Sequence, residues 1–238
     1  MNLVRLALLV LASGCVLTAD GAERSASHSS SDLLPAPTGP LRVDFGEDTT
    51  LGEILSAFAA NTGQHVLLDG RTEAVLAQRP VVLGGATEVP AAEVYAFVEG
   101  LLYFHDLFVA PIKGGERPLL GVYSEGHGLR KATPMDVAEQ ELERYADHPA
   151  LLIRTTVQLT KTDVRQLATS LRAMLMDTNT QLLLPVGDNS ILMGGTGSDV
   201  ARLARTMRAI DEDAGRAQAA RQAKRAEGEP DPSKEGAR

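Results

Sequence analysis

Apolar and polar residues alternate with two different periods along this chain, and the pattern divides its middle into two units. The first unit spans residues 41–124. Leu41–Phe45 alternates apolar and polar side chains, which predicts a strand with one buried face. Thr50 and Glu53 then have the spacing of a capping box at the start of a helix. Apolar residues recur along that helix at i, i+3, i+4, i+7 and i+8, as one face requires: Leu51, Ile54, Leu55, Phe58 and Ala59.

The rest of the first unit repeats this alternation of strands and helices. Two short apolar runs, His65–Leu68 and Pro80–Leu83, predict two further strands. Pro90 is suited to the first turn of a second helix, whose apolar face has the spacing of the first. That face comprises Val94, Phe97, Val98, Leu101 and Leu102. Leu107–Ile112 and Leu119–Tyr123 then predict a hairpin, so the expected order is β-α-β-β-α-β-β.

The second unit spans residues 151–212 and predicts the order β-α-β-β-α. A strand at Ile153–Leu159 precedes a helix that we expect Thr162 to cap. Gln181–Val186 and Ser190–Met193 predict two strands around a turn, and we expect Ser198 to cap the last helix. The two helices carry apolar stripes: Val164, Leu167, Ala168, Leu171 and Leu175 in the first, and Val200, Leu203, Ala204, Met207 and Ile210 in the second. The predicted fold class is therefore α+β, with two small modules in tandem.

Two polar segments flank the second unit. Residues 125–150 are rich in charged side chains, with a short helix possible around Met135–Tyr145, and we interpret them as a linker. Residues 213–238 contain mainly Ala, Arg, Lys, Glu and Gln. The last helix can continue past Asp213, and Pro230 and Pro232 would end it. Because no apolar stripe is left to pack, we expect this tail to be solvated or disordered.

The N-terminus has the pattern of an export signal. A basic start and the apolar run Leu6–Ala12 lead to Ser13, Gly14 and Cys15, which resembles a bacterial lipoprotein signal box. Cleavage of residues 1–14 would leave Cys15 to carry a lipid. The alternative is an ordinary secretory signal cut after Ala19 or Ala22. Both interpretations export the protein, and residues 15–40, rich in Ser, Pro and small side chains near their end, predict a flexible tether.

Charge is distributed unevenly between the two units. Residues 41–124 hold 5 Lys or Arg against 11 Asp or Glu, a net charge of −6, whereas residues 151–211 hold 7 against 5, a net charge of +2. An acidic first unit is poorly suited to nucleic acid, because phosphate binding needs clustered Lys and Arg. A protein partner with a basic face, or a merely solvated surface, fits this charge better.

The sequence shows no arrangement of residues typical of an enzyme. The five histidines lack metal-ligand spacing, and Cys15 is the only cysteine, so neither a disulfide nor a thiolate metal site is expected. The segment Gly194–Asp199 lies between a strand and a helix, where phosphates can bind. It lacks the third glycine of a dinucleotide site and the lysine of a P-loop. We therefore predict no catalytic residues, no cofactor and no metal.

The order and residue patterns of the two units resemble those of the periplasmic N-terminal domains of secretins. Secretins are the ring-forming outer-membrane channels of secretion systems and type IV pili. Val43–Asp69 is similar to the opening of the first such domain, which some TonB-dependent receptors share as a signalling domain. Thr155–Asp211 resembles the next secretin module, which has a KH-like fold. No further repeat and no membrane-inserting β domain follow Asp211 in this sequence. The resemblance therefore implies a periplasmic protein that is not itself a pore.

What the resemblance implies for function is protein–protein contact in secretion or pilus assembly. The expected partners are a secretin channel or inner-membrane secretion components, with a homo-oligomeric ring also possible. Strand edges are the candidate contact sites, because unpaired backbone groups can extend a partner's sheet; interior strands without a free edge are the alternative for the same residues. The candidates are Leu41, Arg42, Val43, Asp44 and Phe45 in one strand, and Leu107, Val109 and Ile112 in another.

Two functions of other classes stay open. One is an envelope scaffold that assembles by itself, and the other is a module that binds peptides or cell-wall fragments. We expect the protein in the cell envelope, as an outer-membrane lipoprotein facing the periplasm with the lipid as its only membrane contact, or as a soluble periplasmic protein. Val16, rather than Asp, follows Cys15 and favours the outer membrane.

Overall fold

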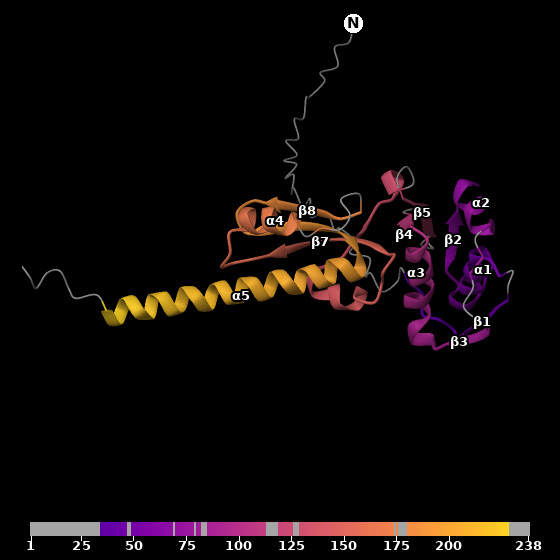
Figure 1. The fold of residues 1–238 in the computed structure, drawn as a ribbon, viewed down its shortest axis with the longest axis horizontal. Coiled ribbons are helices and arrows are strands. Elements are labelled where there is room, and N and C mark those ends of the chain that lie inside the picture. The colour runs from indigo at the N-terminus through magenta and orange to yellow at the C-terminus, as the bar shows by residue number, and fades with distance from the viewer. Residues whose placement is uncertain are drawn as a thin grey trace, which may run out of the picture.

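The computed structural model describes residues 34–46, 49–68, 70–78, 80–81, 85–112, 119–125, 129–173, 175 and 180–228. Two modules lie next to each other along the long axis of the molecule, and helix α5 (Gly197–Gly228) extends away from them (Figure 1). Each module combines short strands in small sheets with packed helices, so the predicted α+β class is confirmed.

The first module contains two small sheets. Strands β1 (Leu41–Phe45) and β3 (Gly85–Val89) form an antiparallel ribbon. Strands β2 (His65–Leu68), β5 (Leu119–Ser124) and β4 (Leu107–Ile112) form the second sheet, in the order β2-β5-β4. Three helices accompany them: α1 (Leu51–Thr62), α2 (Gly70–Gln78) and α3 (Val94–Phe104).

Helix α1 forms as its sequence predicts. The Thr50 side chain accepts a hydrogen bond from the Glu53 backbone N–H, and the Glu53 carboxylate accepts one from the Thr50 N–H at 2.8 Å, which completes the capping box. The helix ends at Gly63, whose φ of 68° is a left-handed conformation that glycine adopts without strain. Of the predicted stripe, Leu51, Ile54, Leu55 and Phe58 are buried.

The segment between β2 and α3 differs from the prediction. Of the strand expected at Pro80–Leu83, Pro80 forms an isolated bridge with Thr50, and Val82 and Leu83 lie outside the described residues. The strand that pairs with β1 is β3. Val89 of β3 lies opposite Leu41, and burial of both side chains fixes this register. Helix α2 was not predicted, because a helix that buries chiefly Leu76 has no apolar stripe. Pro90 starts a short 3₁₀ turn (Ala91–Glu93) rather than α3 itself.

The second module has the predicted order β-α-β-β-α. Strands β7 (Leu152–Gln158), β9 (Ser190–Thr196) and β8 (Leu182–Val186) are antiparallel neighbours, and helix α4 (Val164–Arg172) packs against β8 and β9 while α5 packs against β7 and β9. Both predicted caps are off by one or two residues. Asp163, not Thr162, accepts from the first N–H groups of α4, and Thr196, not Ser198, accepts from the Asp199 N–H in α5.

The stretch expected to be a linker is instead folded onto the second module. Strand β6 (Met135–Asp136) pairs in parallel with β7, and a 3₁₀ helix, η4 (Glu139–Tyr145), packs against α5. Glutamates of η4 form ion pairs with α5, Glu139 with Arg208 at 2.5 Å and Glu143 with Arg205 at 3.2 Å. Although this stretch is rich in charged residues, four of its side chains are buried in the core: Met135, Val137, Leu142 and Tyr145.

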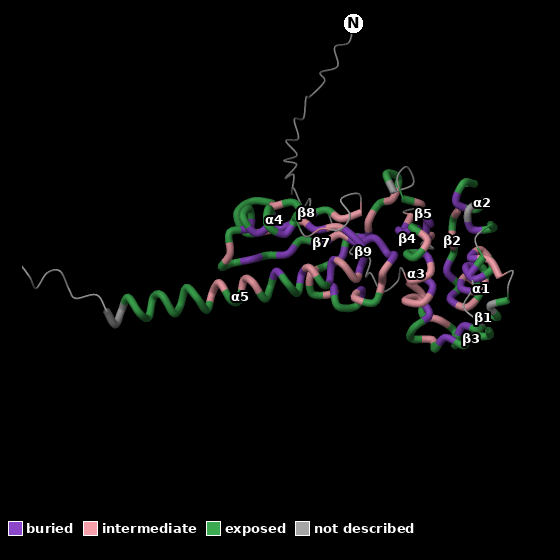
Figure 2. The backbone as a smooth tube through the Cα atoms, in the orientation of Figure 1, coloured by how far each residue is buried: buried purple, intermediate pink, exposed green. Residues whose placement is uncertain are grey.

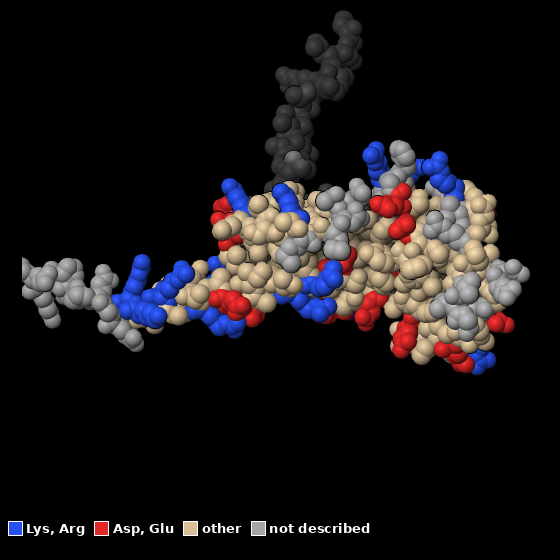
Figure 3. Space-filling view, in the orientation of Figure 1, with Lys and Arg blue, Asp and Glu red and all other residues tan. Residues whose placement is uncertain are grey.

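Helix α5 continues well past the end of the predicted module. Its first half buries Val200, Ala204 and Met207, and beyond Asp211 its surface becomes exposed (Figure 2). Lys and Arg side chains gather along this distal part (Figure 3). Up to Gly228 the tail is a helix, mostly exposed over residues 213–225, so the prediction of a solvated tail is confirmed there and that of disorder is wrong, while residues 229–238 lie outside the described structure. Among the described helices, none is both apolar and long enough to span a bilayer.

Candidate functional site

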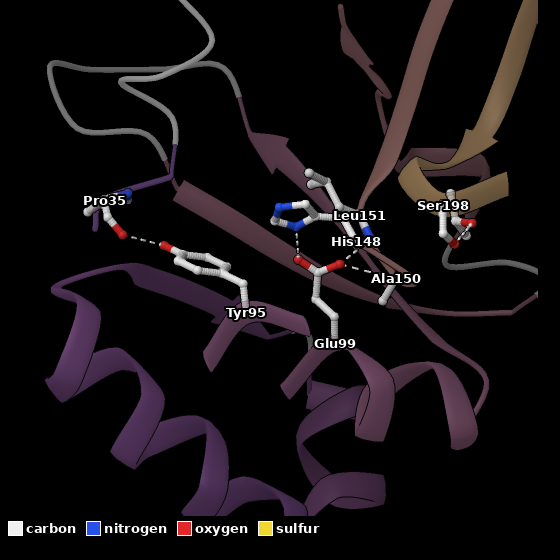
Figure 4. Close-up of polar contacts among 8 residues, drawn as sticks. Pro35, Tyr95, Glu99, His148, Ala150, Leu151 and Ser198 are labelled. Atoms are coloured by element: carbon white, nitrogen blue, oxygen red, sulfur yellow. Dashed lines mark hydrogen bonds and ion pairs between the residues drawn. The ribbon is translucent and has the colours of Figure 1, made fainter. Parts of the chain in front are cut away.

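A buried carboxylate, Glu99, lies where the two modules meet. Glu99 projects from α3 of the first module, and its side chain is 5% exposed. One carboxylate oxygen is 2.7 Å from Nδ1 of His148. The other accepts hydrogen bonds from the backbone N–H groups of Ala150 at 3.1 Å and Leu151 at 2.9 Å (Figure 4). All three partners precede or begin the second module, so this one side chain ties α3 to it.

The segment His148–Leu151 is held from both sides. From the first module, the Val109 N–H of β4 donates to the Ala150 carbonyl at 2.9 Å. From the second, the N–H groups of Gly197 and Ser198 at the start of α5 donate to the carbonyls of Leu151 and His148. A Cβ at Gly197 would lie 2.5 Å from the Tyr145 carbonyl oxygen, so only glycine permits this close approach.

The end of the predicted tether is docked rather than free. The Tyr95 hydroxyl donates to the Pro35 carbonyl at 2.8 Å (Figure 4), and Asn61 accepts from Thr38 and donates to Gly39. Burial raises the pKa of Tyr95 well above its ordinary value, with nearby Glu99 adding to the effect and a hydrogen bond to Thr62 opposing it. Tyr95 therefore stays protonated and keeps its donor role. Residues 34–40 form a strap across the first module, and the tether prediction is wrong for them.

The first set of predicted contact residues lies in the β1–β3 ribbon. Leu41 and Val43 are buried and face the core, whereas Arg42 and Asp44 are exposed on the outer face. Arg42 pairs with Glu88 of β3 at 3.4 Å. The side chain of Phe45 lies outside the described set. Since β1 pairs only with β3 in the described part of the chain, each strand of the ribbon has one unpaired edge.

The second set lies on β4, whose outer edge meets the second module. Leu107 and Val109 are buried and Ile112 is half-buried. Val109 bridges Leu151 in parallel, and Phe108 and Ala110 pack on Leu152. The structure therefore offers no free edge at the centre of β4, because the molecule itself occupies it.

Strand β8 is an edge strand that the sequence did not single out. Its outer face exposes an apolar stripe of Leu182, Leu184 and Val186, each about half exposed. The Arg172 guanidinium of α4 donates twice to the Leu183 carbonyl, at 3.1 and 2.9 Å, and Pro185 has no N–H to offer. Both features block pairing of another strand along this edge.

Sequence reasoning missed Glu99 and His148. The signal for Glu99 was a single carboxylate inside the otherwise apolar run Val94–Phe104, where a charge needs a partner. His148 carried no such signal, because its partner is distant in sequence. Of the other histidines, His65 opens β2 and His105 caps α3, while His28 and His127 lie outside the described residues.

The structure also locates the remaining segments that the sequence singled out. The turn Gly194–Asp199 ends β9 and starts α5, as interpreted from the sequence. No group of three His, Cys, Asp or Glu side chains able to hold a metal ion occurs within the described ranges. The export signal and the predicted lipidation site, Cys15, lie outside those ranges.

No protein-family model matches this chain, and no curated protein matches its sequence. Solved structures do match. The enterotoxigenic Escherichia coli GspC–GspD complex of the type II secretion system is 18% identical over 73% of this chain and 99% of that chain, with a TM-score of 0.28. The N-terminal domain of the secretin XcpQ from Pseudomonas aeruginosa is 15% identical over 73% of this chain and 65% of that chain, with a TM-score of 0.25.

A third match is a larger assembly. The Klebsiella pneumoniae type II secretion system outer membrane complex of PulD, PulS and the PulC HR domain is 18% identical over 70% of this chain, with a TM-score of 0.47. The match spans 26% of that chain, so this protein corresponds to about a quarter of its length. The solved structures that match thus include secretin N-terminal domains, the family that the sequence resembles.

Proposed function

We propose that this chain is a periplasmic, secretin-like N-domain protein that acts in protein secretion or type IV pilus assembly through protein–protein contacts. In this proposal it is neither an enzyme nor the pore. The observation that carries the proposal is the β1–β3 ribbon, a two-stranded sheet whose strands each keep an unpaired edge in the described structure. Such an edge accepts a partner's strand through backbone hydrogen bonds.

The ribbon suits this role better than the other strand edges. The second module meets β4, and Arg172 and Pro185 block β8. No described strand other than β3 pairs with β1, although the Thr49 hydroxyl donates to the Asp44 carbonyl of β1 at 2.8 Å. Charged side chains such as Arg42 and Asp44 stand on its exposed face and can select a partner by charge. The family resemblance supplies the partner class, a secretin channel or inner-membrane secretion components.

A double charge reversal in β1 tests the proposal. Arg42→Glu with Asp44→Lys keeps the net charge and the buried Leu41 and Val43, so the fold should persist. We expect loss of the partner when intact cells are crosslinked and the tagged protein is purified for mass spectrometry. The matched control, Arg71→Glu with Glu73→Lys on exposed α2, should retain it. Retained capture of a secretin or inner-membrane component by the β1 variant would contradict the proposal.

The exposed stripe on β8 favours a second candidate function, a scaffold built from copies of this chain. Exposed contiguous apolar side chains commonly mark contact surfaces. The purified fragment 22–238 should then form oligomers whose size rises with concentration in sedimentation experiments, and Leu184→Ser should reduce them. A fragment that stays monomeric at all concentrations would exclude this candidate.

The proposed location is the outer membrane, facing the periplasm, with a lipid on Cys15 as the anchor. Metabolic labelling with a palmitate analogue should mark the wild-type protein and not a Cys15→Ala variant. An unlabelled wild-type protein in the periplasmic fraction would favour the soluble alternative.

A further inference from the structure

The exposed charges of this protein are separated along the long axis of the molecule. Residues 41–124, within the first module, have a net charge of −6, from 5 Lys or Arg and 11 Asp or Glu. Residues 216–225 of α5 have a net charge of +4, because they contain four cations and no acidic residue: Arg216, Arg221, Lys224 and Arg225. The first module and this part of α5 lie at opposite ends of the molecule (Figure 1). One molecule therefore cannot bring the two charged regions into contact.

The basic end of α5, residues 216–225, is exposed along its whole length. The helix is tied to the second module as far as Gln218, whose side-chain amide donates to the Lys161 carbonyl at 2.9 Å. Ala, Arg, Gln and Lys make up the basic end and favour a helix, so the segment holds its cations at fixed spacing without packing against a core. Arg216 pairs with Asp213, whereas the other three cations form no ion pair within the described residues.

An acidic edge lies at the other end of the molecule. It comprises three exposed side chains on the β1–β3 ribbon and on the 3₁₀ turn that follows it: Asp44, Glu88 and Glu93. Arg42 is the one cation of the described ribbon, and both side chains of its 3.4 Å pair with Glu88 are more than half exposed. Asp44 and Glu93 form no ion pair within the described ranges. Figure 3 shows acidic side chains along the lower edge of the first module, and Lys and Arg at the far end of α5.

The two surfaces match in charge and in length. From Arg216 to Arg225 the helix rises about 14 Å, and a five-residue strand such as β1 or β3 spans about 13 Å. A helix laid along the ribbon therefore places several cations within reach of the acidic edge. Complementary charges of this kind speed the encounter of two proteins and select the partner, and their effect weakens as salt screens them.

We propose that the basic end of α5 docks along the acidic edge of a second copy of this chain. Arg221, Lys224 and Arg225 of one copy pair with the acidic side chains of the other. Because the two surfaces are different and lie at opposite ends, every copy can use both at once, so the contact repeats and builds open chains or a closed ring. This contact goes beyond the strand pairing proposed for the ribbon, and β8 takes no part in it.

Sedimentation velocity of the purified full chain tests this inference. We expect association that rises with protein concentration at about 0.05 M salt and is lost at about 0.5 M salt. Arg221→Glu with Lys224→Glu should weaken the association about 10-fold, because attraction becomes repulsion at two positions. Glu88→Lys with Glu93→Lys should weaken it to a similar extent. An equimolar mixture of these two variants should associate again, because the reversed helix then meets a reversed edge.

Two control variants separate this contact from other effects. Arg130→Glu with Lys131→Glu changes the net charge by the same amount as the α5 variant, at exposed residues of the 3₁₀ helix η3 (Leu129–Lys131), and should leave the association unchanged. Leu184→Ser on the exposed stripe of β8 should leave it unchanged as well.

Five results would overturn the inference. They are a wild-type chain that stays monomeric at low salt, association that salt does not affect, no association in the mixture, loss of association in Leu184→Ser, or binding of α5 to vesicles of anionic phospholipid in place of a second copy.

Discussion

At the scale of single residues, Glu99 stabilises the junction through three acceptor contacts. Glu99→Ala leaves the His148 ring nitrogen and two backbone N–H groups without their acceptor. Because each buried unsatisfied donor costs about 1–3 kcal/mol, we expect the free energy of unfolding to fall by about 3 kcal/mol. Glu99→Gln, which retains one acceptor oxygen, should cost less. Urea denaturation followed by circular dichroism measures both effects.

The matched control for Glu99 is Glu93→Ala, an exposed glutamate just before α3. It should change the free energy of unfolding by less than about 0.5 kcal/mol. If Glu99→Ala unfolded at the same urea concentration as Glu93→Ala, the contacts at the junction would contribute nothing to stability.

Asp211 makes the stability of the fold depend on pH in the acidic range. Burial alone would raise its pKa, but hydrogen bonds from the backbone N–H groups of Thr160 and Lys161 outweigh it and lower the pKa below the ordinary value. A carboxylate whose pKa is lowered in the folded protein stabilises the fold at pH values above its ordinary pKa. This stabilisation is lost as the pH falls through the lowered pKa. The Asp211 contribution is thus present above about pH 4 and disappears below it.

Asp211→Asn should therefore be less stable than wild type at pH 7, with the difference shrinking as the pH approaches 2. Thermal denaturation at a series of pH values measures this. A difference between the two proteins that stayed constant from pH 7 to pH 2 would show that the Asp211 charge has no part in it.

At the scale of elements, β8 shows how an exposed edge is kept from pairing. Arg172→Ala removes two hydrogen bonds to the Leu183 carbonyl and uncovers that backbone group. We expect about 1 kcal/mol lower stability and faster, concentration-dependent aggregation, since a free edge beside an apolar stripe recruits other strands. Light scattering during incubation measures the aggregation. Arg165→Ala, on the same helix and exposed, should behave like wild type, and equal aggregation of both variants would refute the role of Arg172.

At the scale of the whole molecule, the two modules share one continuous hydrophobic core across the junction. Gly197 permits the close approach of η4 to α5 there. Gly197→Ala places a Cβ 2.5 Å from the Tyr145 carbonyl oxygen and 3.0 Å from Cβ of His148, so η4 must move. We expect a loss of about 1–3 kcal/mol and faster protease cleavage within residues 129–150.

The control is Gly100→Ala on α3, where an added Cβ meets nothing within 4 Å. Because alanine favours a helix more than glycine does, this variant should be as stable as wild type or more stable by about 0.5–1 kcal/mol. Unchanged protease resistance in Gly197→Ala would show that the two modules are not coupled through η4.

The sequence predicted the elements whose stability is local. Helix α1 combines a capping box, an apolar stripe and a terminal glycine, so its bounds followed from its own residues. Strand β3 could not be placed this way, because its register depends on Val89 meeting Leu41, a contact 48 residues apart. The same applies to residues 129–150, because their few apolar side chains are buried only when they pack against α5 and β7.

The candidate site was predictable to a similar extent. The edge of β1 followed from the alternation Leu41–Phe45, whereas the covering of β4 by Leu151 and Leu152 depended on how the modules pack. No pattern of spacing could pair Glu99 with His148, because this contact forms only when both modules are folded.

The docking of the strap sets how far the body of the protein can stand from a membrane. The sequence predicts an anchor at Cys15. If the chain is anchored there, the segment between the anchor and the folded body ends at Leu34, where the described strap begins, and not at Leu41. Fully extended, the 19 residue steps between Cys15 and Leu34 span at most about 65 Å. With a lipid on Cys15, Leu34 and the docked strap could therefore lie no farther than that from the bilayer surface.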